Sequence, residues 1–417
     1  MGSQVKMVQS KSKMKKNKTR NKKVSKKIEN KDVDPFRRMQ SIFENNIFLH
    51  EVSIKEIGKH AQKYDNENIN PLMEILKNKI GKGKKGNKKK IKFSKKELSG
   101  VHKVFENIIK TQPLQGHLFS KNTIVSMVST LDILLSKLFS FYYEKNPKKL
   151  SLENQSIKFG ELENIENIEE AQKFLINREI ESLLIEEGLN RKLQVLKKDM
   201  GLNLDSINKN LEELKKLIKI RNLIVHNEGQ MDREYIKKYG DKTSELNKNI
   251  IVTDKYLNDS LFLLYFIGTY IIQEAQFSFS EEIKKKNFLL INPMHYLVKH
   301  EQYHLLRSIY DFVLNPKISA SERKYIVINY CIGLKKQGRK LEDIEKVLML
   351  EDWSLTRDDF EMCKSALLDK DQEFYKYLKK VIKAKEIGLE EINTWAIFTF
   401  HKDKQEFKSI VKNVKPL

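Results

Sequence analysis

The sequence contains few residues that break helices or cross-link chains. Among its 417 residues there are only 7 prolines, 16 glycines and 2 cysteines. Segments in which apolar and polar residues strictly alternate, and the turn pairs that join β-strands, are also few. These absences argue against a β-sheet, and we predict an all-α fold.

The two cysteines, Cys331 and Cys363, lie far apart and form no Cys-x-x-Cys pair. Neither a disulfide framework nor a cysteine zinc site is therefore expected. Long apolar runs are also missing, because the longest, Leu261 to Ile272, has 12 residues and is too short to span a bilayer. Since the N-terminus has no apolar leader, we expect a cytoplasmic protein that does not bind membranes.

Positive charge is in excess, with a formal net charge of +23. Two segments carry nearly all of it. Residues 1–31 contain 12 Lys and Arg against the single acidic residue Glu29, and residues 77–96 contain 11 Lys and no acidic residue. Such segments attract RNA backbones without reading sequence, although Lys-rich segments also serve only as solubilising elements. The lysines expected to bind RNA are Lys84, Lys85, Lys88, Lys89 and Lys90.

Changes in composition divide the chain into four parts. Residues 1–32 are expected to form a disordered basic tail, and residues 33–114 an N-terminal helical region that includes the Lys-rich loop. Residues 115–280 are expected to form a central helical bundle. Residues 287–417 read as serial helical hairpins, an arrangement that usually binds a partner, here a regulatory protein.

The patterns within these parts also predict individual helices. The N-terminal region is expected to contain one helix from Pro35 to Phe48 and a second from Ser53 to Tyr64. The C-terminal region is expected to begin with one long helix from Met294 to Leu314.

One helix of the central region carries a combination suited to RNA cleavage. It is predicted to run from Asp205 to Gly229, and Arg221, Asn222 and His226 lie near its end. Cleaving RNA without a metal needs a proton carrier that titrates near neutral pH and a fixed cation beside the phosphate. Histidine and arginine supply these two functions.

On a helical wheel, Arg221 falls within the apolar stripe of this helix, which includes Leu214, Leu217, Ile218 and Ile224. A charge buried there requires a carboxylate, a second subunit or a bound phosphate as its partner. The simpler alternative is that the Arg221 side chain extends to solvent and that His226 caps the end of the helix.

The segment resembles the R-x4-6-H signature of the HEPN (higher eukaryotes and prokaryotes nucleotide-binding) superfamily, in the form with a polar residue after the arginine. The upstream helix from Ser126 to Leu138 resembles the first long helix of the family, which often carries an acidic residue where Asp132 stands. The segment from Glu161 to Leu204 is similar to the connecting region of the family. The resemblance covers about residues 115–280.

The resemblance implies a helical bundle that dimerises, so that two Arg-His pairs form one endoribonuclease site. In such a site His226 moves protons at the ribose 2'-hydroxyl or the leaving 5'-oxygen, Arg221 stabilises the phosphorane, and Asn222 positions the phosphate or the histidine. Asp132 would fix the Arg221 side chain. The product would be a 2',3'-cyclic phosphate, made without a metal or another cofactor.

The family also implies a biological setting of antiviral defence, abortive infection or a toxin system. Some HEPN domains have no nuclease activity. The main alternative is therefore a non-catalytic module that binds a nucleotide or a partner protein.

A second motif lies in the C-terminal region, where His300, Glu301 and His304 match the H-E-x-x-H pattern of zinc metalloproteases. Arg307 and Tyr310 occupy the positions at which one such family needs Gly and a third histidine ligand. Both histidines of the motif lie off the apolar face of the predicted helix, so we expect them to face solvent. We therefore rank a metalloprotease below the nuclease.

Overall fold

The computed structural model describes residues 34–64, 114–150, 156–163, 165–185, 188–240, 246–279, 288–354 and 356–412, and the single positions 70, 74, 94, 99 and 414. The basic tail and all lysines of the Lys-rich loop lie outside the described residues, so the RNA contacts expected there stay predictions. The described residues form helices and turns with no strand, apart from an isolated bridge between Gln230 and Asn249. The predicted all-α fold is confirmed.

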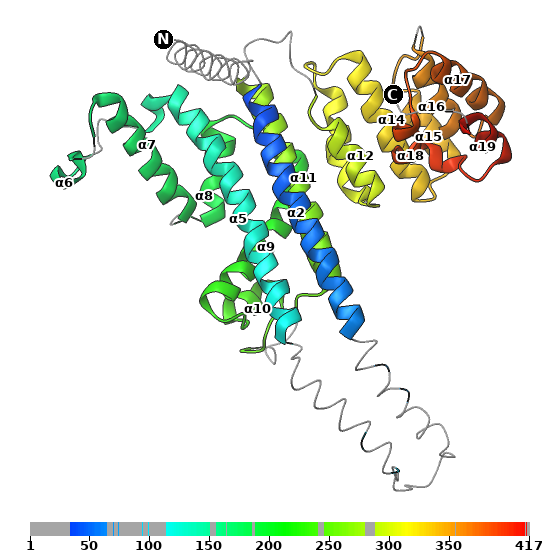
Figure 1. The fold of residues 1–417 in the computed structure, drawn as a ribbon. Coiled ribbons are helices and arrows are strands. Elements are labelled where there is room, and N and C mark those ends of the chain that lie inside the picture. The colour runs from blue at the N-terminus through cyan, green and yellow to red at the C-terminus, as the bar shows by residue number, and fades with distance from the viewer. Residues whose placement is uncertain are drawn as a thin grey trace, which may run out of the picture.

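Three long helices form the centre of the molecule and lie side by side in Figure 1. They are α2 (Pro35–Tyr64), α5 (Leu114–Lys145) and α11 (Asp254–Phe279), and each packs against the other two. A fourth helix, α9 (Asn208–His226), packs against α5 and α11. Their buried side chains belong to one hydrophobic core.

Helix α11 is apolar on all sides, which is typical of a helix that is covered on all sides. Its buried residues include Leu264, Phe266 and Ile267. Gly268 lets α2 come close, because a Cβ atom at this position would lie 2.2 Å from the Cζ atom of Phe43. The long apolar run of the sequence is therefore a core helix.

The N-terminal helix differs from the prediction in two respects. The two expected helices are one continuous α2, because Ser53 does not cap a second helix and instead donates a hydrogen bond to the carbonyl oxygen of Leu49. Helix α2 also belongs to the bundle, since Phe36, Phe43 and Ile47 are buried in the common core. The boundary expected near residue 114 therefore does not separate α2 from the central helices.

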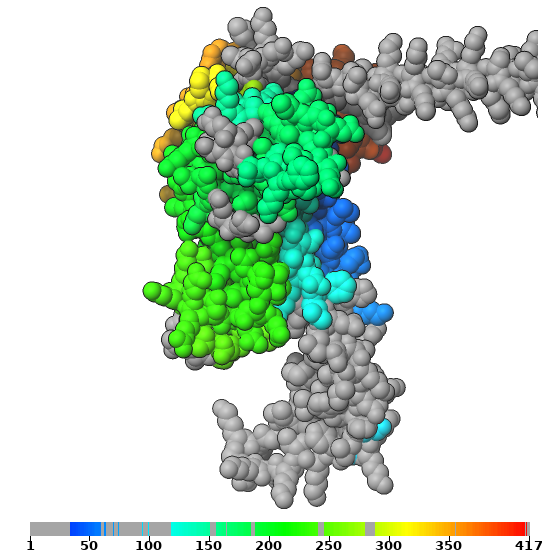
Figure 2. Space-filling view, turned by 90° about the vertical axis from the view of Figure 1, so that its left-hand side faces the viewer, coloured from blue at the N-terminus to red at the C-terminus, as the bar shows by residue number. Residues whose placement is uncertain are grey.

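Short helices connect α5 to α9, and one more short helix, α10, follows α9. The connecting segment includes α7 and α8, which together with α9 and α10 lie on the face shown in Figure 2, beside α5 in cyan and α2 in blue. These elements are η2 (Pro147–Leu150), α6 (Phe159–Leu162), α7 (Ile168–Ile185), α8 (Gly188–Gln194), the π-helical turn η4 (Val195–Asp199), η5 (Asp205–Ile207) and α10 (Arg233–Tyr239).

The C-terminal region is a series of short helices on the other side of α11 (Figure 1). The hydroxyl of Tyr296 donates to Glu51 of α2 at 2.5 Å, and the ring of Phe312 contacts that of Tyr270 of α11. The elements are α12 (Ile291–Lys299), η8 (Tyr303–Leu305), α13 (Leu306–Tyr310), η9 (Asp311–Leu314), α14 (Ala320–Lys336), α15 (Leu341–Leu348), α16 (Asp358–Leu367), α17 (Asp371–Lys383), α18 (Leu389–Thr394), η10 (Ala396–Phe400) and α19 (Gln405–Val411).

The single helix predicted from Met294 to Leu314 is wrong. Helix α12 ends at Lys299, and Glu301 has a positive φ of 60°, which an α-helix does not allow. The chain resumes with the short elements η8, α13 and η9.

Helix α5 has one further property that the longest apolar run of the sequence does not indicate. The stretch Leu118–Lys145 is long and apolar enough to cross a membrane by length and composition alone, and half of its most apolar window is buried. Core helices of soluble proteins have the same character, and α5 packs against α2, α7, α9 and α11.

Candidate active site

Arg221 lies on α9 at the edge of the buried face of the helix. The fully buried residues of α9 recur every third position, at Leu214, Leu217, Ile220 and Leu223. Because an α-helix has about 3.6 residues per turn, a stripe with this spacing winds around the helix axis. The Arg221 side chain is consequently 28% exposed, and does not project from the middle of the apolar stripe as the wheel predicted.

Asp132 of α5 is the acidic residue next to Arg221. Its Oδ2 atom lies 3.6 Å from Nη2 of Arg221, and its Oδ1 atom accepts a hydrogen bond of 2.7 Å from Nζ of Lys192 on α8. One carboxylate thus bridges two cations from two different helices. The three side chains tie α5, α8 and α9 together.

Lys192 is the member of this cluster that the sequence analysis missed. Its side chain is only 6% exposed, and a buried ammonium group is stable only when it is paired. In the sequence, Arg191 and Lys192 look like an ordinary charged helix surface. No feature of composition or spacing distinguishes Lys192 from the many exposed lysines of the chain.

Asn222 contacts the second terminal nitrogen of the Arg221 guanidinium group. Its Oδ1 atom accepts a hydrogen bond of 3.0 Å from Nη1 of Arg221. The Nε–H group of Arg221 is buried, yet it has no hydrogen-bond partner among the described residues. Since a guanidinium group offers five N–H donors, Arg221 retains donors for an anion such as a phosphate.

His226 is the last residue of α9, and its side chain is exposed. The helix stops because the amides of Asn227 and Gly229 both donate to the carbonyl oxygen of Leu223, each at 2.9 Å, and Gly229 has a positive φ of 79°. Lys121 of α5 donates to the carbonyl oxygen of Glu228 at 3.0 Å. The exit from α9 is therefore fixed against the beginning of α5.

Arg221 and His226 leave the same helix in different directions. Five residues correspond to about 7.5 Å along the helix axis and a rotation of about 140°. No hydrogen bond or ion pair connects the two side chains in the part of the chain that is described. The structure therefore brings Arg221 together with Asn222, Asp132 and Lys192, and leaves His226 apart from them.

The surface around this cluster exposes apolar side chains. Ile133, next to Asp132 on α5, is 49% exposed, and Val225, one turn after Arg221 on α9, is also 49% exposed. Ser129 and Ser136 lie one turn before and after Asp132 on the same side of α5. This combined surface of α5 and α9, defined by Ile133 and Val225, is called the α5–α9 face below.

The H-E-x-x-H motif does not form the geometry that a metalloprotease needs. His300 follows the last residue of α12, and the chain leaves the helix at Glu301, so the two histidines do not share one helix face. His300 does not face solvent as expected, because its ring packs against Tyr296 and Phe262 and its Nε2 atom lies 3.8 Å from Glu51. Burial lowers the pKa of His300.

Among the described residues, no group of three or more His, Cys, Asp and Glu side chains is arranged to hold a metal ion. The chain as a whole matches no protein-family model, no curated protein and no solved structure. The resemblance to the HEPN superfamily therefore rests on α9 and its neighbours alone.

Proposed function

We propose that this protein is a metal-independent endoribonuclease of the HEPN type that acts as a homodimer in the cytoplasm. Arg221, Asn222 and His226 are the proposed catalytic residues, and Asp132 and Lys192 position Arg221. The biological setting that the family resemblance suggests is antiviral defence, abortive infection or a toxin system.

The observation that carries the proposal is the state of the Arg221 guanidinium group. It is anchored by Asp132 and Asn222, partly exposed, and retains a buried Nε–H group without a partner. Buried donors without partners are rare in folded proteins and call for an explanation. A phosphate would bind the partly exposed Nη groups of Arg221, and the buried Nε–H group would gain an acceptor only if the side chain turned towards the phosphate.

The reaction follows from the chemistry of these groups. The ribose 2'-oxygen attacks the adjacent phosphorus, and its proton passes to a histidine. The bond from phosphorus to the 5'-oxygen then breaks, and the leaving oxygen takes a proton from a histidine. Arg221 stabilises the charge that develops on the phosphorane oxygens. The products are a 2',3'-cyclic phosphate and a free 5'-hydroxyl.

A dimer explains why one chain separates Arg221 from His226. A two-fold contact through the α5–α9 face would bring the arginines and histidines of two copies around a shared cleft. Exposed apolar residues such as Ile133 and Val225 are suited to such a contact, because oligomer interfaces are more apolar at their centres than the remaining surface.

A non-catalytic role is the second candidate, and one observation favours it. The pairs formed by Asp132 with Lys192 and Arg221 would hold three helices together without any RNA. In that case Arg221 and Asp132 would be needed for stability, and His226 would be dispensable.

Cleavage of RNA by the full-length protein in excess EDTA tests the proposal. We expect fragments with cyclic phosphate ends, and loss of cleavage in His226→Ala and Arg221→Ala. His304→Ala and Arg307→Ala change exposed residues of the same types and are expected to cleave like the unaltered protein. The nuclease is refuted if an mRNA, a tRNA and a ribosomal RNA all stay intact at micromolar protein, and a monomer in light scattering would contradict the shared site.

A further inference from the structure

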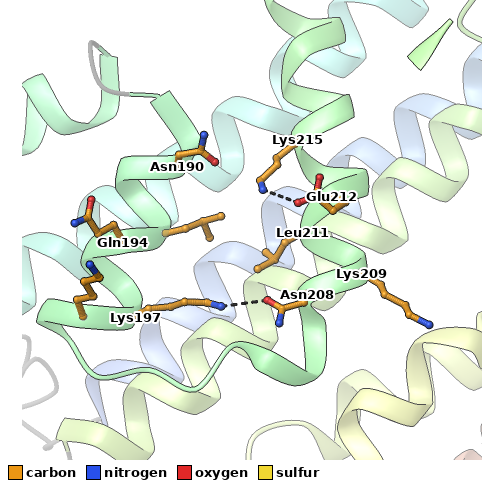
Figure 3. Close-up of a pocket in the computed structure, with 10 residues that line it drawn as sticks. Asn190, Gln194, Lys197, Asn208, Lys209, Leu211, Glu212 and Lys215 are labelled. Atoms are coloured by element: carbon orange, nitrogen blue, oxygen red, sulfur yellow. Dashed lines mark hydrogen bonds and ion pairs between the residues drawn. The ribbon is translucent and has the colours of Figure 1, made fainter. Parts of the chain in front are cut away.

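A second feature of α9 lies in its N-terminal half, ahead of the candidate active site in the sequence. An open groove of about 510 Å³ separates α8 and the turn η4 from the first half of α9 (Figure 3). The residues that line it are Asn190, Leu193, Gln194, Lys197, Lys198, Asn208, Lys209, Leu211, Glu212 and Lys215.

The groove is basic. Four of its lining residues are lysines and one, Glu212, is acidic. Lys215 pairs with Glu212 at 2.5 Å, and Lys197 contacts Asp205 at 3.3 Å and Asn208 at 3.1 Å. Lys198 and Lys209 are exposed and form no ion pair with any described residue. Two cations therefore remain after the internal pairs are counted, although the Lys209 side chain points away from α8 and stands at the outer rim of the groove (Figure 3).

The ligand that these side chains suit is a chain of phosphates. None of the lining residues is aromatic, so the groove offers no platform on which a base would stack. Asn190, Gln194 and Asn208 add neutral hydrogen-bonding groups of the kind that contact phosphate and sugar. Such a site recognises a backbone and carries little sequence information.

The local backbone at Lys197 and Lys198 supports a functional role. Both residues lie on the π-helical turn η4, a rare structure that is frequently found at functional sites. The turn closes with a hydrogen bond of 3.0 Å from the Met200 amide to the Val195 carbonyl oxygen, and Gly201 follows with a positive φ of 69°. The hydroxyl of Tyr142 on α5 also donates to the carbonyl oxygen of Asp199 at 2.5 Å.

The groove and the candidate active site share helix α9. Lys215 and Asn222 are seven residues apart, and two turns of helix place them on nearly the same side about 10 Å apart. On the opposite wall, Leu193 of the groove is adjacent in sequence to Lys192, which contacts Asp132. A strand that leaves the groove along α9 therefore arrives at Arg221 and Asn222.

We propose that this groove binds the sugar-phosphate backbone of the single-stranded RNA whose scissile phosphate lies at Arg221. The inference rests on the proposed nuclease function, and it names the surface that guides the substrate. Lys198, and Lys209 at the outer rim, are the lysines left to contact the backbone, because neither is neutralised within the described chain.

The test measures binding separately from cleavage. The probe is a fluorescent RNA of about 12 nucleotides, within the range of known single-strand sites, with every ribose 2'-O-methylated so that no 2'-oxygen can attack. Anisotropy at several salt concentrations gives Kd for the unaltered protein, Lys198→Glu/Lys209→Glu, and the control Lys346→Glu/Lys402→Glu. The control makes the same charge change at exposed lysines of the C-terminal region.

We expect the groove variant to raise Kd at least about tenfold, and to reduce the slope of log K against log salt by about 1.4 for two lost phosphate contacts. With cleavable RNA, its kcat/KM should fall through a higher KM. His226→Ala should bind the probe like the unaltered protein. Inorganic phosphate and AMP, which hold one phosphate each, should compete only at far higher concentrations than the probe.

Three other outcomes would each overturn a part of the proposal. Equal affinities of the groove and control variants would overturn the groove and leave the nuclease standing. Weaker binding by the groove variant, together with no cleavage by the unaltered protein, would overturn its role as a substrate guide along with the nuclease. Competition by AMP at the affinity of the probe would show a site for free nucleotides in place of a strand.

Discussion

The Oδ2 atom of Asp132 on α5 lies 3.6 Å from the Nη2 atom of Arg221 on α9, and the same carboxylate accepts a hydrogen bond from the buried Lys192. This arrangement gives Arg221 two roles at once. It is part of an ion-pair cluster that joins helices, and it presents a cation at the surface. Stability and activity must therefore be measured side by side in every variant of this cluster.

Removing the charge of Asp132 should destabilise the fold. Asp132→Asn leaves Lys192 buried without its anion, and we expect a loss of about 3 kcal/mol in the free energy of unfolding, measured with urea. Lys192→Met should cost less, because no buried charge is left behind. In the double variant, part of the loss should be recovered. Strictly additive effects of the two substitutions would contradict the pairing.

Arg221→Lys separates the catalytic role of Arg221 from its structural role. Lysine keeps the positive charge beside Asp132, so the free energy of unfolding should change by less than about 1 kcal/mol. Lysine cannot reproduce the planar array of donors, and kcat/KM for RNA cleavage should fall by about 100-fold. Activity at the level of the unaltered protein would show that Arg221 contributes only charge.

Charges on the α5–α9 face should disrupt the dimer without unfolding the chain. Ile133→Asp and Val225→Asp place a carboxylate at residues that are already half exposed, so the fold should keep its thermal midpoint. Light scattering should show monomers, and cleavage should be lost with the dimer. The matched control is Met349→Asp, a substitution at an exposed apolar residue of the C-terminal region. Dimers that persist in both variants would place the interface elsewhere.

His295 should make the protein sensitive to acid. Burial lowers the pKa of His295 to about 4, from 6.5 in the unfolded chain. Acid therefore favours the unfolded state: the stabilisation is complete above pH 6.5 and decreases as the pH falls towards 4, with about 2 kcal/mol lost at pH 5.

His295→Phe provides the comparison for this effect, because it keeps a ring against Trp395 and removes the titrating group. Between pH 7 and pH 5 the variant should lose less stability than the unaltered protein in urea denaturation. Parallel stability curves for the two proteins would mean that His295 titrates normally.

The sequence predicted those features that depend on local patterns. The all-α fold was predicted, and so was the end of the α9 segment at Gly229, where a positive φ favours glycine three residues after the last helical residue, His226. The sequence did not reveal Lys192, because its burial results from the packing of α8 on α5. The helical wheel placed Arg221 in the middle of the apolar stripe, whereas the structure places it at the edge. An ideal wheel does not include the winding of the buried face around α9.

The prediction of two separate N-terminal helices and the prediction of one helix from Met294 to Leu314 were wrong for related reasons. Ser53 looks like a helix cap in isolation, but the buried residues of α2 on both sides of it hold the helix straight through this position. Glu301 has no feature that demands a positive φ, and the turn there follows from the packing of Tyr296 and His300 on α2 and α11.

The buried state of Lys192 gives its amine a chemical behaviour that differs from that of its neighbours. An ammonium group that is inaccessible and bound to a carboxylate reacts slowly with acylating reagents, whereas the exposed Lys198 and Lys209 react at once. Acylation of Lys192 would therefore report the moment at which α8 separates from α5. Among the many lysines of this chain, Lys192 is a built-in marker for the opening of the helices around Arg221.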